Sequence, residues 1–195
     1  SNSTTASHYS VNGGANDWSF VQIGAGGLNL FDSWENSPAL PPGGWSLSNQ
    51  AGQVGWEFGA VCTNYTDGPT SFPSASLGFA TNLCGDYDSS SDNSLISPNY
   101  FVPVGASARF VWKHWMCSED TWDGGALYYS VNGGNWIQAY VNTGNGTNWY
   151  DGTITNTFAF SGTDVWDGRQ YVNAAGAFSC SSTVNLSLIH ISEPT

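Results

Sequence analysis

Residues 107–141 read SARFVWKHWMCSEDTWDGGALYYSVNGGNWIQAYV, and this stretch says most about the fold. Its first part alternates with a period of two, as a half-buried strand does. The inner face of this strand is predicted to carry Phe110, Trp112, His114 and Met116, and the outer face Arg109, Val111, Lys113 and Trp115. Beyond an acidic loop, Asn132-Gly133-Gly134 separates residues 126–131 from residues 135–141, and Asn-Gly supplies the positive φ angles of a tight hairpin. The stretch therefore predicts a strand, an acidic loop and a β-hairpin.

The composition favours an all-β protein. Only 9% of the 195 residues are charged, whereas 40% are hydrophobic and 24 are glycine. Long amphipathic helices have little material here for a polar face, while ten Trp, nine Tyr and ten Phe can fill one sizeable core. We expect one domain over residues 1–185, with a polar N-terminal segment at residues 1–20.

The net charge of -12 excludes several classes of partner. Nucleic acid and anionic membranes both attract Lys and Arg clusters, and the chain holds three such residues. No apolar run approaches the length needed to span a membrane. We expect a secreted or cell-surface protein that binds an extracellular glycan or protein, without membrane insertion.

Short apolar segments separated by turn residues recur along the chain, which is typical of a β-sandwich with jelly-roll topology. The predicted strands before the hairpin are residues 18–23, 27–31, 44–47, 54–62, 75–80, 100–104 and 109–116, and those after it are residues 153–160 and 170–178. The predicted core comprises Trp45, Trp56, Phe110, Trp112, Leu127 and Ile137. YSVNGG occurs at residues 9–14 and again at residues 129–134, which suggests two similar hairpin turns.

The last ten residues, LSLIHISEPT at 186–195, differ from the Gly- and Asn-rich style of the rest. They resemble the translation of a common sequencing adapter, so we interpret them as a non-native tail. The alternative is a genuine C-terminal strand. On the first interpretation the natural chain continues beyond about Asn185.

Four cysteines without CxxC spacing favour disulfides over a metal site. Three connectivities are possible, and we favour Cys62 with Cys84 and Cys117 with Cys180. Three N-glycosylation sequons fit a secreted surface, at Asn2, Asn64 and Asn145.

Four sequence pieces occur in an order that resembles a known group of domains. They are PPGGW at 41–45, GFATNLCGDYDSSSDNSLISP at 78–98, WKHWMCSEDTWDGGALYYSVNGGNW at 112–136 and FSGTDVW at 160–166. The order is similar to that of MAM-like, cleaved-adhesin-like and immune-inhibitor-A-like jelly-roll modules. The resemblance covers roughly residues 30–185 and implies a non-catalytic accessory domain of a secreted peptidase or cell-surface protein. Asn132 departs from the group, which usually has Asp there. The group usually continues for a further strand or two, so the resemblance also implies that this domain lacks its last strand or strands, and an open sheet edge invites self-association.

A structural calcium ion is predicted at the acidic loop, where Glu119, Asp120 and Asp123 lie within five residues. Grouped carboxylate oxygens are the ligands that calcium prefers. Glu119 and Asp123 fall on acidic positions of the resembled motif, and Glu35 matches its early acidic position. The predicted ligands are therefore Glu35, Glu119 and Asp123 with main-chain carbonyls, and the alternative is a solvated turn.

Four aromatic residues among Gly, Asp and Asn suggest a glycan site, with packing over the ends of the sandwich as the alternative. They are Trp122, Trp149, Tyr150 and Trp166. No catalytic motif is recognisable, and His114 is expected to be a buried core residue. The function classes that compete are an adhesion or accessory module, a filament or surface-layer subunit, and a glycan-cleaving enzyme that uses Glu35, Glu57 or Glu119.

Overall fold

The structure is a computed structural model of the whole chain. It describes residues 3–11, 17–23, 29–31, 44–49, 51–62, 64, 77–101, 107–115, 117–119, 121–140, 150–155, 161–166, 171–172, 178–179 and 185–192. For residues 3–31, 101, 107–113, 115 and 171–192, it describes only the backbone of the strands.

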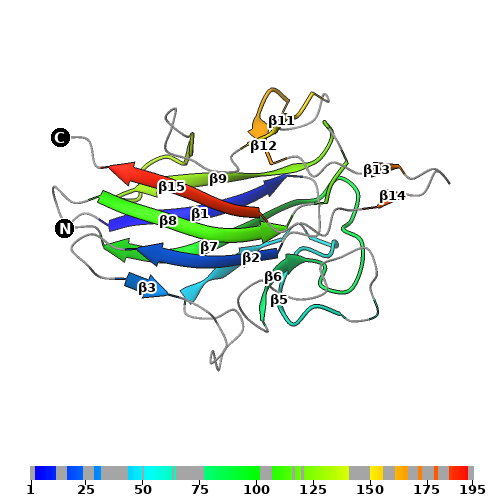
Figure 1. The fold of residues 1–195 in the computed structure, drawn as a ribbon, viewed down its shortest axis with the longest axis horizontal. Helices are drawn as coiled ribbons and strands as arrows, with labels where there is room; N and C mark the ends of the chain where they lie inside the picture. The colour runs from blue at the N-terminus through cyan, green and yellow to red at the C-terminus, as the bar shows by residue number, and fades with distance from the viewer. Residues whose placement is uncertain are drawn as a thin grey trace.

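Two large antiparallel sheets make up the fold (Figure 1). The five-stranded sheet has the order β10 (Ile137–Gln138), β9 (Gly124–Val131), β1 (Ser3–Val11), β7 (Asp92–Phe101) and β4 (Ser46–Ser48). The six-stranded sheet has the order β15 (Asn185–Ser192), β8 (Ser107–Trp115), β2 (Asp17–Ile23), β6 (Gly78–Thr81) and β5 (Trp56–Gly59), and β3 (Asn29–Phe31) pairs with β2. Two small sheets join β11 (Gly152–Thr153) to β12 (Asp164–Val165) and β13 (Tyr171–Val172) to β14 (Phe178–Ser179).

The predicted all-β class is confirmed, because the described residues contain strands and turns but no α-helix. Among these residues, no helix is long and apolar enough to cross a membrane. Four antiparallel pairs are nested in the chain, namely β1 with β9, β2 with β8, β4 with β7 and β5 with β6. Nested pairs of this kind are what a jelly roll requires, and the jelly-roll topology itself stays a prediction.

Large side chains between the two sheets form the core. The ring of Trp45, next to β4, lies 5.5 Å from that of Phe79 in β6, and the Trp56 indole in β5 donates to the Asn93 carbonyl in β7 at 3.4 Å. Trp45, Trp56 and Leu127 are buried, as predicted. The side chains of Phe110 and Trp112, also predicted for the core, lie outside the described residues.

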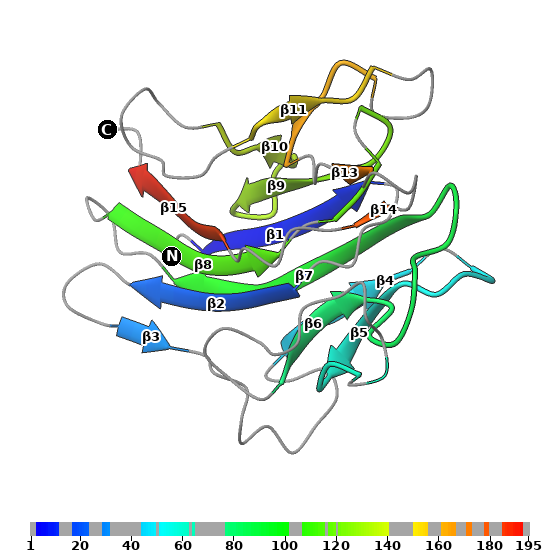
Figure 2. The same ribbon diagram turned by 45° about the vertical axis from the view of Figure 1, so that its right-hand side comes forward.

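The prediction that Ile137 belongs to the core is wrong, since 49% of this residue is exposed. Ile137 lies in the two-residue strand β10, at the end of the five-stranded sheet beyond β9 (Figure 2). Its side chain lies on the same face of the sheet as that of its cross-strand partner Tyr129. Among the described residues little covers Ile137 itself, so an apolar side chain in a correctly predicted strand remains exposed.

The hairpin prediction is confirmed in β9 and β10. Ile137 pairs with Tyr129, and the Gly134 N–H donates to the Val131 carbonyl at 2.9 Å. Asn132 and Gly133 have φ angles of 54° and 71°, the positive values that a type I′ turn needs at both central positions.

The first copy of YSVNGG does not form a similar hairpin. Residues 9–11 end β1 in one sheet, whereas β2 begins at Asp17 in the other, so the two strands do not pair. Polar β1 was not among the predicted strands, yet it lies in the middle of its sheet, between β7 and β9.

Residues of the presumed non-native tail pair with β8 as the edge strand β15, from Asn185 opposite His114 to Ser192 opposite Ser107. An apolar segment can add to an open sheet edge whatever its origin. The pairing is therefore compatible with a native strand and with a foreign segment.

Candidate functional site

The acidic loop between β8 and β9 folds back on itself. Cys117 and Ser118 are buried, and Glu119 is exposed. The Glu119 carbonyl accepts the N–H groups of Trp122 at 3.1 Å and of Asp123 at 2.9 Å. Thr121 has a φ of 66°, a left-handed conformation that is uncommon for residues other than glycine. The loop is therefore a tight turn of defined shape.

Three neighbouring groups hold this turn in place. The Tyr87 hydroxyl donates to Asp123 Oδ2 at 2.8 Å, and the Ser118 hydroxyl donates to the Asp123 carbonyl at 3.1 Å. On another side, the Thr155 N–H next to β11 donates to the Thr121 carbonyl at 3.0 Å. Two distant segments and a hydrogen bond within the loop thus fix the acidic loop.

The carboxyl group of Asp123 lies in an environment that disfavours its charge. Burial raises its pKa from 3.8 to about 6, the hydrogen bond from Tyr87 acts in the opposite direction, and the charge of Glu119 raises it further. Burial and the neighbouring Asp123 also raise the pKa of the Tyr87 hydroxyl. Near neutral pH the loop therefore holds a partly buried carboxylate beside a second acidic residue.

Trp122 is the part of the loop that faces solvent, since 49% of the residue is exposed. Among the described aromatic residues predicted to bind a glycan, namely Trp122, Tyr150 and Trp166, it is the most accessible. Trp149, from the same prediction, lies outside the described residues.

Trp166 cannot present its face to a glycan as predicted, because only 3% of it is exposed. Its ring packs 4.6 Å from that of Tyr150 and 5.2 Å from the imidazole of His114. Its N–H and carbonyl pair with Gly125 in β9. The alternative interpretation, packing over the sandwich, holds for Trp166.

Tyr150 also has a structural task. Its hydroxyl accepts the Leu127 N–H at 2.9 Å and donates to the Leu127 carbonyl at 3.2 Å. Burial raises the pKa of this hydroxyl. Tyr150 therefore occupies the edge of β9 in the gap between β10 and Trp166, and its polar group is used inside the fold.

His114 is buried, as expected from its predicted strand face. Burial lowers its pKa from 6.5 to about 3, so the imidazole is neutral at physiological pH. It packs against Trp166 as a core residue.

The calcium prediction concerns residues that are only partly described. Glu35 and Asp120 lie outside the described residues. In the part of the chain that is described, no three His, Cys, Asp or Glu residues gather closely enough to hold a metal ion. Glu119 and Asp123 do lie in one turn, so these two carboxylates remain as candidate ligands.

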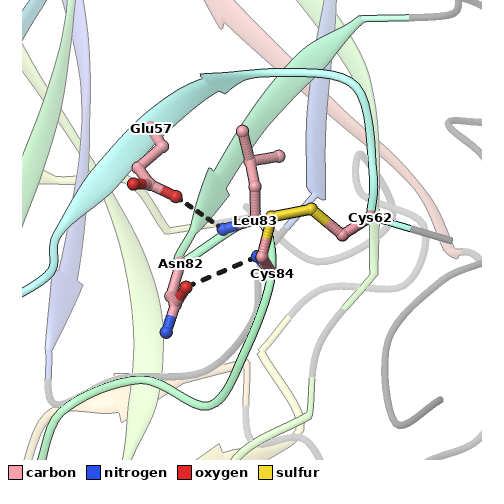
Figure 3. The surroundings of a disulfide bond; sticks show 5 residues. All are labelled: Glu57, Cys62, Asn82, Leu83 and Cys84. Carbon is pink, nitrogen blue, oxygen red and sulfur yellow. Dashed lines mark hydrogen bonds between the residues drawn. A yellow bond between two sulfur atoms is a disulfide. The ribbon is translucent and has the colours of Figure 1, made fainter. Parts of the chain in front are cut away.

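A disulfide joins Cys62 to Cys84, the pairing favoured from the sequence, with the Cα atoms 5.0 Å apart (Figure 3). Beside it the Glu57 carboxylate accepts the Leu83 N–H at 2.8 Å, and the Asn82 side chain accepts the Cys84 N–H at 3.4 Å. The carboxylate of Glu57 is therefore engaged in fixing this loop.

The other two cysteines are described only in part. Cys117 is disulfide-bonded, whereas Cys180, its predicted partner, lies outside the described residues. Of the three sequon asparagines, Asn64 is exposed, and Asn2 and Asn145 lie outside the described residues.

Sequence reasoning missed Tyr87, the hydroxyl donor that anchors Asp123. Tyr87 lies between the predicted strands at residues 75–80 and 100–104, in a segment rich in Ser and Asp. No local pattern connects it with a loop that begins thirty residues later. The one signal in the sequence is that Tyr87 is an aromatic residue in an otherwise polar segment, which suggests a tertiary contact.

Comparison with known proteins gives one partial similarity. Over 125 residues, or 64% of its length, the chain is 32% identical to bacillopeptidase F of Bacillus subtilis (strain 168). The chain spans 8% of the length of this relative, so the similarity concerns a small part of that protein. No family model matches the chain, and no solved structure matches it. The resemblance to MAM-like and adhesin-like modules stays a prediction.

Proposed function

We propose that the chain is a non-catalytic accessory module of a longer secreted or cell-surface protein. The small share of bacillopeptidase F that it matches supports a module rather than a whole peptidase. The Cys62–Cys84 disulfide supports an oxidising compartment outside the cytosol. The use of Glu57 as a structural acceptor and the burial of neutral His114 support a role without catalysis.

Within this role, we propose that the acidic loop presents Trp122 to an extracellular glycan. The observation that carries the proposal is the exposure of Trp122 on a turn held by Tyr87, Ser118 and Thr155. A fixed aromatic face binds with little loss of conformational entropy. Its apolar ring suits the C–H face of a sugar, and the neighbouring carboxylates can accept sugar hydroxyl groups.

The charge of the chain narrows the class of glycan. At -12, the protein repels polyanions such as uronic-acid polymers. Glu119 is exposed in the same turn as Trp122 and adds a local negative charge. The proposed ligands are therefore neutral polysaccharides.

The test is calorimetric titration of the protein with a panel of soluble neutral polysaccharides, with alginate as the anionic comparison. We expect one or more neutral polymers to bind, alginate to fail, and Trp122→Ala to abolish binding. Trp136→Ala is the matched control, because it removes an equally exposed indole from another part of the surface. Binding that survives Trp122→Ala, or that is lost equally in Trp136→Ala, contradicts the proposed site.

We also propose that calcium stabilises this loop, through Glu119 and Asp123 together with Glu35. The raised pKa of Asp123 and the charge of Glu119 support a nearby cation, because a divalent ion would offset both. An ion that binds only the folded state raises the melting temperature by mass action. An equal melting temperature in calcium and in chelator would contradict this proposal and leave the glycan proposal standing.

A further inference from the structure

Strand β10 forms an edge of the five-stranded sheet within the described residues. Its one partner among these residues is β9. The Ala139 N–H donates to the Leu127 carbonyl of β9 at 2.8 Å. Since the N–H and C=O groups of successive residues in a strand point to opposite sides, those of Trp136, Gln138 and Tyr140 point away from β9.

Three large side chains along this edge are exposed, whereas Ala139 is buried and the half-buried Gln138 side chain donates to the Asp164 carbonyl at 2.6 Å. The exposed fractions are 48% for Trp136, 49% for Ile137 and 58% for Tyr140. Trp136 and Tyr140 lie on one face and Ile137 on the other, by the alternation of a strand. The Tyr140 ring is held in place by two contacts. Its hydroxyl donates to Gln138 Oε1 at 2.8 Å, and its ring centroid lies 6.1 Å from that of Tyr150 in an edge-on arrangement.

Charge is absent from this edge. Residues 132–140 contain no Asp, Glu, Lys or Arg, although the chain has fifteen acidic residues. Edge strands of soluble proteins commonly carry charges or prolines that prevent pairing with another chain. β10 has neither, and its two-residue length is its one protection, so its side chains leave strand addition possible.

We propose that two copies of this chain associate by antiparallel pairing of β10 with β10 around a two-fold axis at Gln138. In this register the outward N–H and C=O groups of Gln138 meet those of the partner's Gln138. Trp136 then lies opposite the partner's Tyr140 on one face, and Ile137 lies opposite the partner's Ala139 on the other. Each pair occurs twice, so the strand is complementary to itself.

Charge and size determine how strong this dimer is. Two copies of net charge -12 repel each other, and they can approach closely only along an uncharged strip such as residues 132–140. Salt screens the repulsion, so the association strengthens as ionic strength rises. A single strand pair covers little area, so the dimer is weak and depends on protein concentration.

Sedimentation velocity over a range of protein and salt concentrations tests the proposal. We expect a monomer–dimer equilibrium that shifts toward dimer with added sodium chloride. Ile137→Glu should weaken the dimer about tenfold, because the change occurs twice across the axis. Ser89→Glu, which adds the same charge at an exposed position in the loop between β6 and β7, should leave it nearly unchanged.

Cross-linking tests the register itself. In the proposed pairing the two Gln138 Cα atoms lie about 5.5 Å apart, a separation that a disulfide can bridge. Gln138→Cys should therefore form a covalent dimer under oxidising conditions, whereas Trp136→Cys should not, because the axis separates its two copies. A protein that stays monomeric at every concentration and salt level, or a dimer unaffected by Ile137→Glu, would overturn the proposal.

Discussion

Replacing Tyr150 with phenylalanine removes one hydroxyl and leaves the aromatic ring in place. The ring keeps its contact with Trp166, whose centroid lies 4.6 Å away. The lost group accepts the N–H of Leu127 at 2.9 Å and donates to its carbonyl at 3.2 Å. The carbonyl retains the N–H of Ala139, at 2.8 Å, so the Leu127 N–H is the group that loses its acceptor.

The magnitude follows from the burial of Leu127. This residue is only 3% exposed, so water does not readily replace the tyrosine oxygen. An unsatisfied buried donor costs about 1–3 kcal/mol. At roughly 2–4 °C per kcal/mol for a domain of this size, the melting temperature should fall by roughly 2–12 °C.

Urea denaturation of Tyr150→Phe measures this cost directly. The midpoint should shift to lower urea with an unchanged slope, since the surface exposed on unfolding stays the same. Tyr140→Phe is the matched control, because the hydrogen bond that its hydroxyl donates to Gln138 Oε1 is exposed to water, and its stability should change by less than about 0.5 kcal/mol. Equal stability of Tyr150→Phe and wild type would refute the assigned role of the Tyr150 hydroxyl.

Three further predictions concern the loops around the site. The pKa of Asp123 is raised in the folded state, so its contribution to stability is present below pH 3.8 and is lost as pH rises through about 6. In the presence of chelator, Asp123→Asn should therefore be more stable than wild type at pH 7. In thermal melts its melting temperature should also change less than that of wild type between these pH values. Gly55→Ala should destabilise the protein in urea titrations, because its Cβ would clash with the side chain of Asn49, which is held by two hydrogen bonds to the backbone of Trp56; an unchanged midpoint would contradict this. The double replacement Cys62→Ala with Cys84→Ala removes a cross-link between residues 22 apart in sequence, which restricts the unfolded chain. The free energy of unfolding should fall by about 3 kcal/mol, as measured by urea denaturation against wild type.

Local patterns were sufficient to predict much of the fold. The period-two alternation at residues 109–116 predicts β8, and Asn132-Gly133 predicts the turn that joins β9 to β10. Both signals depend on neighbouring residues, and the structure confirms both elements. The preferred pairing of Cys62 with Cys84 also agrees with the structure.

Predictions that depend on tertiary position were less successful. The polar strand β1 lacks apolar alternation, and its place between β7 and β9 is set by sheet pairing rather than by its own sequence. β7 begins at Asp92, inside a segment rich in Ser and Asp that has the composition of a loop. Propensity is a weak guide where ladder pairing supplies the hydrogen bonds.

The candidate site was predictable in composition but not in arrangement. The acidic residues that lie close together in the sequence identify the loop that contains Glu119 and Asp123, and Trp122 lies within this loop. Trp166 has equally polar neighbours in sequence, yet it is buried against His114. Exposure of an aromatic residue depends on what folds over it, and that information comes from distant segments.

The central claim is that Trp122 forms the glycan contact of an accessory module. The most direct measurement is a two-dimensional NMR spectrum of the ten tryptophan indole N–H groups, recorded during titration with a neutral polysaccharide that binds. We predict a large shift of the Trp122 signal, assigned from its loss in Trp122→Ala, while the signals of buried Trp56 and Trp166 remain in place. Binding that leaves the Trp122 signal unmoved would contradict the claim.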